Sequence, residues 1–240
     1  MDTVKINSGN VKMIAHRGAS ALERENTVAA FIAAGQRTYY GIETDVHVTA
    51  DGKFAIIHDN TTARVAGGVD LPVEGSTLAE LQAVPLLDMN GVAGRIDLRV
   101  PELGDYVTIC HRYEKESILE LKGRMTDRDI AGIVDVIRSL DHLDNTTFIS
   151  FSPENLLDLR RLFPDVKCQL LPGKEGDWIL PYCVENRIDL DIYHGALTKE
   201  IVDIVHKAGL KVNCWTVDDP AAAERAIEMG VDFITSNRLE

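Results

Sequence analysis

The sequence predicts a closed (β/α)8 TIM barrel, and three observations support this fold class. Eight short runs rich in β-branched and apolar residues recur along the 240-residue chain. Segments that begin with helix-capping residues separate these runs. Such alternation is typical of a parallel sheet covered by helices, and eight units are the number that closes a barrel. An open, doubly wound sheet is the alternative that the same pattern allows.

The expected barrel strands share a composition of Val, Ile, Leu and Thr bounded by turn-forming residues. They are VKMIAH (11–16), GIETDVHV (41–48), SILELK (117–122), TTFISF (146–151), VKCQLL (166–171), IDLDIY (188–193), KVNCWTV (211–217) and VDFITS (231–236). The expected helix starts carry a capping side chain or a proline at the first turn. They are Asn26, Thr126 with Asp129, Ser152 before Pro153, Thr198, and Asp219 before Pro220, the last helix ending at Gly230.

One interval interrupts the alternation of strands and helices. After KFAIIHD (53–59), which we expect to form a hairpin with 41–48 through Asp51 and Gly52, about fifty residues pass before the next barrel strand. This stretch contains a capping box, Thr77 with Glu80, within otherwise loop-like sequence. We therefore expect a single domain over residues 1–240, with a small subdomain inserted after the second strand at approximately 60–112.

The charge balance restricts the partners. A formal net charge of −13 disfavours nucleic acid and stable membrane association, because phosphate backbones and anionic lipids are bound through clustered Lys and Arg. The first ten residues lack the pattern of a secretory signal, and no stretch approaches a membrane span, so we expect a cytoplasmic protein with reduced, buried cysteines. The sequence leaves a homo-oligomer open.

Carboxylates gather on two of the expected strands. Glu43 and Asp45 lie two residues apart and therefore face the same side of their strand, and Glu120 and Lys122 do so on the next barrel strand. Three carboxylates in one barrel mouth repel one another unless a positive charge lies between them. The pattern favours a divalent cation, Mg²⁺ or Ca²⁺, over the alternative of an ion-pair network with Arg and Lys.

Two histidines end strands beside these carboxylates. His16 ends the first strand, and His58 ends the hairpin partner of the second. A lone histidine is usually a structural hydrogen-bonding residue, but a pair at one site can accept a proton on one ring and donate it from the other. We expect the pair to act as general acid and base. His47, in phase with Asp45, is expected to lie on the rim outside the chemistry.

Several motifs together resemble the glycerophosphodiester phosphodiesterase family. In chain order they are HRGAS, ENTVAAF, IETDVHVTADG, IIHD, LELKG and NCWTVDD. Six motifs in this order make a specific resemblance that spans nearly the whole chain. The resemblance implies a (β/α)8 barrel with an inserted subdomain, and one divalent metal held by Glu43, Asp45 and Glu120. The chain departs from the family at its last strand, where Ser236 stands in place of an acid.

The resemblance also implies roles for the side chains around the metal. His16 and His58 match the acid/base pair, and Arg17 and Lys122 match the residues that bind the phosphate. Trp215 matches an aromatic residue beside the substrate, although a Trp at a strand end is as readily explained as part of the core. The expected substrate is a small glycerophosphodiester, hydrolysed to glycerol 3-phosphate and an alcohol.

Three other functions compete with this one. An aldolase using Lys122 as a Schiff-base amine needs an uncharged lysine, and three nearby carboxylates keep it charged. A related phosphodiesterase or phospholipase acting on a lipid or sugar phosphodiester is the second, but the inserted segment has no aromatic or basic cluster to meet a membrane. A non-catalytic, ligand-binding barrel is the third, and the retained acids and histidines argue against it.

Overall fold

The computed structural model describes residues 2–173 and 176–240. The strands are β1 (Lys12–Ala15), β2 (Gly41–Val48), β3 (Phe54–Ile56), β4 (Glu116–Leu121), β5 (Thr146–Ser150), β6 (Lys167–Leu170), β7 (Asp189–Tyr193), β8 (Val212–Trp215) and β9 (Phe233–Ser236). The helices are α1 (Val28–Gly35), α2 (Leu78–Ala83), α3 (Leu103–Arg112), α4 (Asp127–Ser139), the short 3₁₀ helix η1 (Leu143–Asn145), α5 (Pro153–Leu162), α6 (Ile179–Asn186), α7 (Lys199–Lys207) and α8 (Pro220–Met229).

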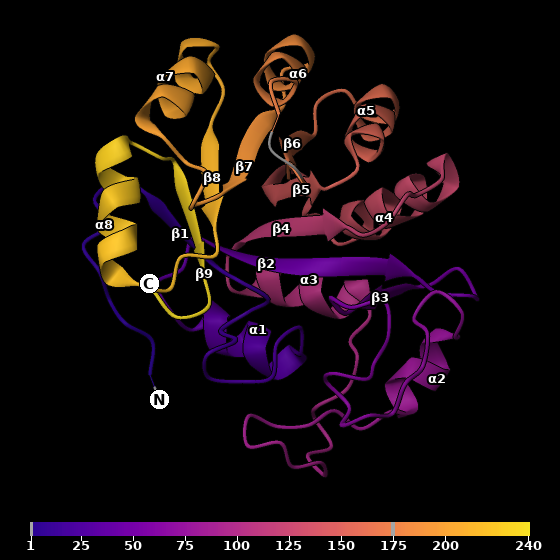
Figure 1. The fold of residues 1–240 in the computed structure, drawn as a ribbon. Coiled ribbons are helices and arrows are strands. Elements are labelled where there is room, and N and C mark those ends of the chain that lie inside the picture. The colour runs from indigo at the N-terminus through magenta and orange to yellow at the C-terminus, as the bar shows by residue number, and fades with distance from the viewer. Residues whose placement is uncertain (1, 174–175) are drawn as a thin grey trace.

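Eight of the strands form a closed parallel barrel, as the sequence predicts (Figure 1). Parallel pairing runs from β1 through β9, β8, β7, β6, β5 and β4 to β2, and the pairing of β2 with β1 closes the ring. The short β3 pairs antiparallel with the end of β2, so the expected hairpin is present. Because the eight barrel strands are parallel, their carboxyl ends lie on one face of the barrel, where side chains from distant parts of the sequence meet.

Two apolar layers hold the barrel and its helices together. The larger core cluster lies between the strands and the ring of helices and includes Phe31, Tyr106 and Phe148, each fully buried. A smaller cluster inside the ring is built mainly from aliphatic residues with Phe233. The four cysteines are all buried and unpaired, and they pack as small apolar residues in this fold.

The segment between β3 and α3 has a core of its own. Its cluster includes Val73, Leu81 and Leu98, and the segment around α2 lies beyond the carboxyl end of β2 in Figure 1. Helix α3, which falls in the stretch assigned to the insertion, instead packs beside α1 and contributes Tyr106 to the main core. We therefore propose that the inserted subdomain ends before α3, and that α3 is a helix of the barrel.

The helix caps mostly follow the sequence. Thr77 and Thr126 form complete capping boxes, Thr198 and Asp219 cap through their side chains, and Gly230 ends α8 in the left-handed conformation. The first helix differs. Its cap is Thr27, whose side chain accepts from the amide of Ala30, and not Asn26.

Candidate active site

A narrow cavity of about 80 Å³ opens at the carboxyl ends of the strands. Its lining residues are His16, Arg17, Glu43, His58, Glu120, Ile149, Phe151, Leu171, Asp191, Trp215 and Thr235. They come from almost every strand of the barrel, which is the arrangement by which this fold builds active sites. Asp45 and Lys122 lie directly beside this set, since Lys122 Nζ is 2.9 Å from Glu120 Oε1 and 3.4 Å from Asp45 Oδ1.

His16 is oriented by the loop that follows β9. Its Nδ1 lies 2.8 Å from Asn237 Oδ1, and Asn237 Nδ2 donates to Asp218 Oδ2 at 2.6 Å, which fixes the amide with its oxygen toward the imidazole. Nδ1 therefore carries the proton, and Nε2 is left as an acceptor, 3.9 Å from Glu43 Oε2. Burial first, and then the neighbouring Arg17, lower the pKa of His16 to about 4. Sequence reasoning missed Asn237 and Asp218, although the departure from the family pattern at Ser236 pointed to this loop.

Arg17 sits in a strained turn directly after β1. Its φ of 55° lies in the left-handed region, and its backbone N–H donates to Glu43 Oε2 at 2.9 Å. The next residue, Gly18, has a φ of 80°, and a Cβ there would come within 2.8 Å of the backbone of Ala30. Glycine is required at this point, because any side chain would collide with the first helix. The turn aims the guanidinium into the site, where Nη1 donates to Glu25 Oε1 at 2.8 Å.

The three predicted ligands form a buried cluster. One carboxylate oxygen of each of Glu43, Asp45 and Glu120 lies within 4.8 Å of the others, and each residue is at most 6% exposed. Within the described residues, 2–173 and 176–240, Asp45 Oδ1 has no hydrogen-bond partner. This oxygen, whose charged contact is Lys122 Nζ at 3.4 Å, lies amid two further carboxylates, an oxygen-rich, negative environment of the kind that Mg²⁺ or Ca²⁺ binds. The residues present therefore fit a divalent cation.

The electrostatics of the cluster point the same way. Burial, and then the charge of Asp45, raise the pKa of Glu43 well above its usual range and that of Glu120 to about 8. Burial alone would raise the pKa of Asp45, but Lys122 and Arg17 outweigh it and hold that pKa below its usual range. Two of the three acids thus resist ionising together unless more positive charge is added to the site, which a divalent cation supplies.

Lys122 is unsuited to Schiff-base chemistry. Burial alone would lower its pKa, but Asp45 and Glu120 together raise the pKa above its usual value. The ammonium therefore stays protonated near neutral pH and cannot act as a nucleophile. It can bind a phosphate oxygen as a point charge.

Asn26 orients the acidic cluster and does not cap the first helix. It is buried with a φ of 53°; its Nδ2 donates to Asp45 Oδ2 at 2.8 Å, and its Oδ1 accepts from Thr44 Oγ1 at 2.7 Å. Because Asn26 is held in the left-handed region by these bonds, the helix starts one residue later, at the Thr27 cap. Asn26 orients one carboxylate of the cluster, a role that the cap pattern concealed.

His58 is oriented by the residue that follows it. Its Nδ1 lies 2.7 Å from Asp59 Oδ1, and because an ionised carboxylate only accepts, Nδ1 is the protonated nitrogen. Nε2 is then free to exchange a proton with a substrate. His47 is buried on β2, and its Nε2 approaches the carbonyl of His58 at 3.3 Å. It is therefore not the rim residue that the sequence suggested, but it does not line the cavity.

The other side of the cavity is apolar and aromatic. Trp215 packs edge to face against Phe151 with ring centroids 5.8 Å apart, and its ring is tilted against that of Tyr193 at 6.0 Å. Its Nε1 donates to the carbonyl of Asp191 at 3.1 Å. Phe151 and Tyr193 are 42% and 52% exposed, so both rings are accessible beside the opening. Asp191, which sequence reasoning missed, is 2% exposed and lines the cavity on this side.

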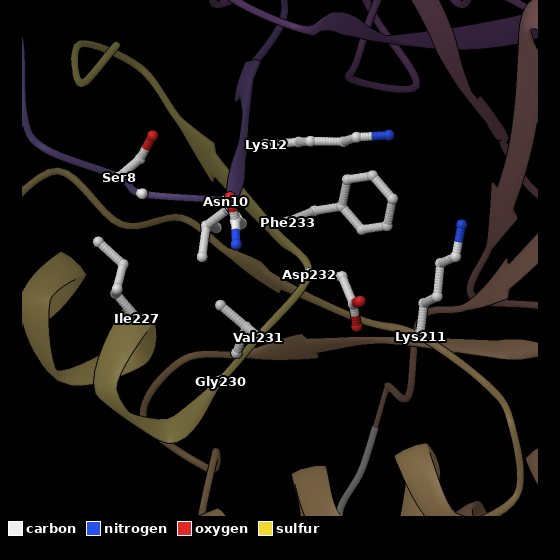
Figure 2. A pocket seen from close by; sticks show the side chains of 11 residues that line it. Ser8, Asn10, Lys12, Lys211, Ile227, Gly230, Val231, Asp232 and Phe233 are labelled. Carbon is white, nitrogen blue, oxygen red and sulfur yellow. The ribbon is translucent and has the colours of Figure 1, made fainter.

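A larger hollow, of about 430 Å³, lies at the opposite end of the barrel. Figure 2 shows Lys12 and Lys211 flanking the ring of Phe233, whose centroid is 5.7 and 5.8 Å from the two ammonium groups. These residues belong to the amino-terminal ends of the strands, where side chains of this fold serve stability. The smaller cavity, with its acids and histidines, is therefore the candidate active site.

One family of known proteins matches most of this chain. The model of the glycerophosphoryl diester phosphodiesterase family matches residues 16–240. The chain belongs to this family. The match begins at His16 and includes the acids, the second histidine and the loop that carries Asn237.

The relatives of this glycerophosphoryl diester phosphodiesterase family member include a glycerophosphodiester phosphodiesterase of Caldanaerobacter subterraneus. It is 30% identical over 236 residues, which cover 95% of this chain and 94% of that protein. An uncharacterized protein of Mycoplasma genitalium is 46% identical over 215 residues, with 86% of each chain covered.

Among solved structures, a phosphodiesterase of Oleispira antarctica in complex with the product sn-glycerol-3-phosphate aligns with a TM-score of 0.85. It is 25% identical, and the alignment covers 98% of this chain and 96% of that one. The barrel and its connections are thus shared over essentially the full length of both chains.

Proposed function

We propose that this protein hydrolyses small glycerophosphodiesters to glycerol 3-phosphate and an alcohol. The observation that carries the proposal is the meeting, at one barrel mouth, of three buried carboxylates, two histidines, an arginine and a lysine. The family membership and the product named for the Oleispira antarctica structure support the same reaction.

We assign Glu43, Asp45 and Glu120 as ligands of one divalent cation. When bound, the cation supplies positive charge that stabilises the developing charge on the phosphoryl oxygens. Arg17 and Lys122 hold phosphate oxygens from the two sides of the acidic cluster, the first through a planar fork and the second as a point charge. Lys122 at 2.9 Å from Glu120 also keeps that carboxylate in place.

His16 and His58 are the proposed acid/base pair. Each ring has its Nδ1–H bound to a protein oxygen, Asn237 Oδ1 or Asp59 Oδ1, which leaves both Nε2 atoms for substrate. One ring enters the step neutral, and its Nε2 accepts the proton of the attacking hydroxyl. The other ring enters as the imidazolium, protonated on both nitrogens, and its Nε2 gives a proton to the departing alkoxide. A poor leaving group of this kind needs such a proton donor, which contributes about 10²- to 10⁴-fold to the rate.

Trp215 is proposed to contact the substrate from the apolar side of the cavity. With the phosphate held between Arg17 and Lys122, the organic part of the diester extends toward Trp215 and Phe151. The identity of the alcohol is set by this aromatic side and by the loops around it.

The deciding experiment measures release of glycerol 3-phosphate from glycerophosphocholine and glycerophosphoethanolamine, with and without EDTA. We expect release that EDTA abolishes, that Mg²⁺ or Ca²⁺ restores, and that His16→Ala removes. Absence of release from both diesters after either metal is restored would reject the proposal. The second candidate, a lipid or sugar phosphodiester, would then be assayed with the same protein.

Cellular location and assembly remain predictions. No helix among residues 2–173 and 176–240 is long and apolar enough to cross a membrane. From the net charge of −13 we propose a cytoplasmic protein without nucleic-acid partners or stable membrane association.

A further inference from the structure

Arg64, in the segment that follows β3, connects two loops of the site. Its guanidinium donates four hydrogen bonds to two carboxylates, although the side chain is 46% exposed. Nη1 and Nη2 lie 2.7 and 2.8 Å from the two oxygens of Glu25, and Nε lies 2.6 Å from Asp59 Oδ2. The planar fork of arginine suits two such contacts at once, whereas an ammonium group does not.

Each of these carboxylates has a second partner inside the active site. Asp59 Oδ1 accepts from His58 Nδ1 at 2.7 Å, and Glu25 Oε1 accepts from Arg17 Nη1 at 2.8 Å. One guanidinium is therefore one hydrogen-bonded residue away from a proposed acid/base group and from a proposed phosphate ligand. His58 and Arg17 come from different strands, and Arg64 lies outside both.

We propose that Arg64 is a positioning residue, which fixes His58 and Arg17 relative to each other through Asp59 and Glu25. The proposal rests on the function proposed above. It gives the segment after β3 a part in catalysis: that segment supplies the cation that binds both carboxylates.

Physical chemistry explains why one cation between two carboxylates would matter here. Hydrogen bonding by Arg64 is the largest cause that lowers the pKa of Asp59 to about 2, and it is also the largest of those that lower the pKa of Glu25 to about 2 against burial. Both groups are therefore ionised near neutral pH and can only accept hydrogen bonds. Without Arg64, Asp59 is free to turn toward water, and the imidazole loses the partner that fixes its tautomer.

The same segment contains a second exposed arginine, comparable with Arg64, whose carboxylate partners do not bond to residues of the active site. Arg95 is 39% exposed and also bridges two carboxylates, with Nη1 2.6 Å from Glu23 and Nη2 2.6 Å from Asp97. Neither acid lines the cavity or bonds to a histidine among the described residues. Arg95 thus bridges two carboxylates as Arg64 does, but its partners have no contact with the site. A variant of Arg95 therefore measures the loss of surface ion pairs alone, without any loss of positioning.

The test compares Arg64→Gln with Arg95→Gln on the metal-loaded enzyme. We expect Arg64→Gln to lower kcat/KM about 10- to 100-fold, the usual cost of losing a group that orients an active-site residue. Arg95→Gln should stay within about twofold of wild type, while both variants lose similar, small amounts of thermal stability. Metal affinity, measured by calorimetry, should be unchanged in both variants, because neither arginine contacts the acidic cluster.

A chemical rescue gives a readout that a purely structural role would not move. Millimolar guanidinium should restore part of the activity of Arg64→Ala and leave wild type and Arg95→Ala unaffected, and Arg64→Lys should recover little because lysine lacks the fork. Equal losses in the two arginine variants, or an Arg64→Ala loss that guanidinium does not relieve, would overturn the proposal. If wild type and Arg95→Gln both fail to hydrolyse any glycerophosphodiester, the proposed function falls, and this inference falls with it.

Discussion

Each end of strand β4 carries a buried glutamate with a lysine beside it, but the two glutamates differ in how many hydrogen-bond donors surround them. At the amino-terminal end, buried Glu116 accepts from Lys167 Nζ at 2.6 Å, Thr147 Oγ1 at 3.0 Å and the Tyr40 hydroxyl at 3.2 Å. At the carboxyl end, Glu120 has Lys122 as its partner but faces two further carboxylates. A buried carboxylate with a full set of hydrogen-bond donors stabilises the fold. Several buried carboxylates that share too few donors indicate a site that binds a ligand or cation.

The largest expected effect would separate these two acids directly. Glu120→Gln should lower kcat/KM by about 1,000-fold or more, because it removes a proposed ligand of the cation, and such a cation contributes several kcal/mol to the transition state. Glu116→Gln should leave kcat/KM nearly unchanged and lower the free energy of unfolding by about 1–3 kcal/mol, the cost of disturbing a satisfied buried group. Enzyme assays, calorimetric metal titration and urea unfolding would measure all three quantities. Similar activity in the two variants would contradict the claim that Glu120 acts in catalysis and Glu116 in stability.

A second comparison uses two histidine–carboxylate pairs of nearly equal geometry. His58 with Asp59 is at the carboxyl end, and His206 with Asp232 is at the other, with nitrogen–oxygen distances of 2.7 and 2.8 Å. His58→Ala should lower kcat about 10²- to 10⁴-fold. His206→Ala should have no effect on kcat beyond the error of the assay. A large loss of kcat in the His206 variant would mean that histidine–carboxylate pairs of this kind affect activity by stabilising the fold.

Substitutions of the lysines at the two ends should differ in kcat/KM by a smaller factor than those of the glutamates. Lys122→Gln should lower kcat/KM about 100-fold, because one donor to the developing charge is lost, and should weaken inhibition by glycerol 3-phosphate. Lys167→Gln should affect only stability, since its ammonium lies against Glu116 at the far end. Unchanged product inhibition in the Lys122 variant would contradict its assignment to the phosphate.

The smallest expected effect concerns the aromatic side of the cavity. Trp215→Phe should raise KM about two- to tenfold while changing kcat less, because a smaller ring retains part of the apolar contact. Trp178→Phe, at an exposed position that does not line the cavity, is the control and should change neither constant. A kcat loss as large as that of the histidine variants would place Trp215 in the chemistry itself.

Much of this architecture could be predicted because strand residues obey a strict alternation. Glu43 and Asp45 share a face of β2, and register places Asp45 opposite Glu120 on β4, so the acidic cluster follows from pairing alone. His16 and His58 follow from their positions at strand ends. The positions of the strands in the sequence were therefore sufficient to predict that these acids and histidines lie at one site.

The residues that orient this cluster were harder to predict, because loops position them. Asn237 and Arg64 carry no periodic signal, and each has a partner distant in sequence, His16 for Asn237 and Glu25 for Arg64. Asn26 misled for a different reason, since a cap residue and a ligand-orienting amide look alike in sequence. The left-handed backbone at Asn26 and its side-chain bonds to Asp45 and Thr44 distinguish the two.

The hydrogen bond between His16 and Asn237 joins residues 221 positions apart in the sequence. It exists only after β9 has inserted beside β1 and the ring has closed. We expect contacts of such sequence separation to form late, because closing a very long loop costs entropy before the contact is made. The orientation of this imidazole is therefore a reporter of the last stage of folding. In a refolding experiment, recovery of activity should lag behind recovery of helical circular dichroism, and the lag would time the closure of the barrel.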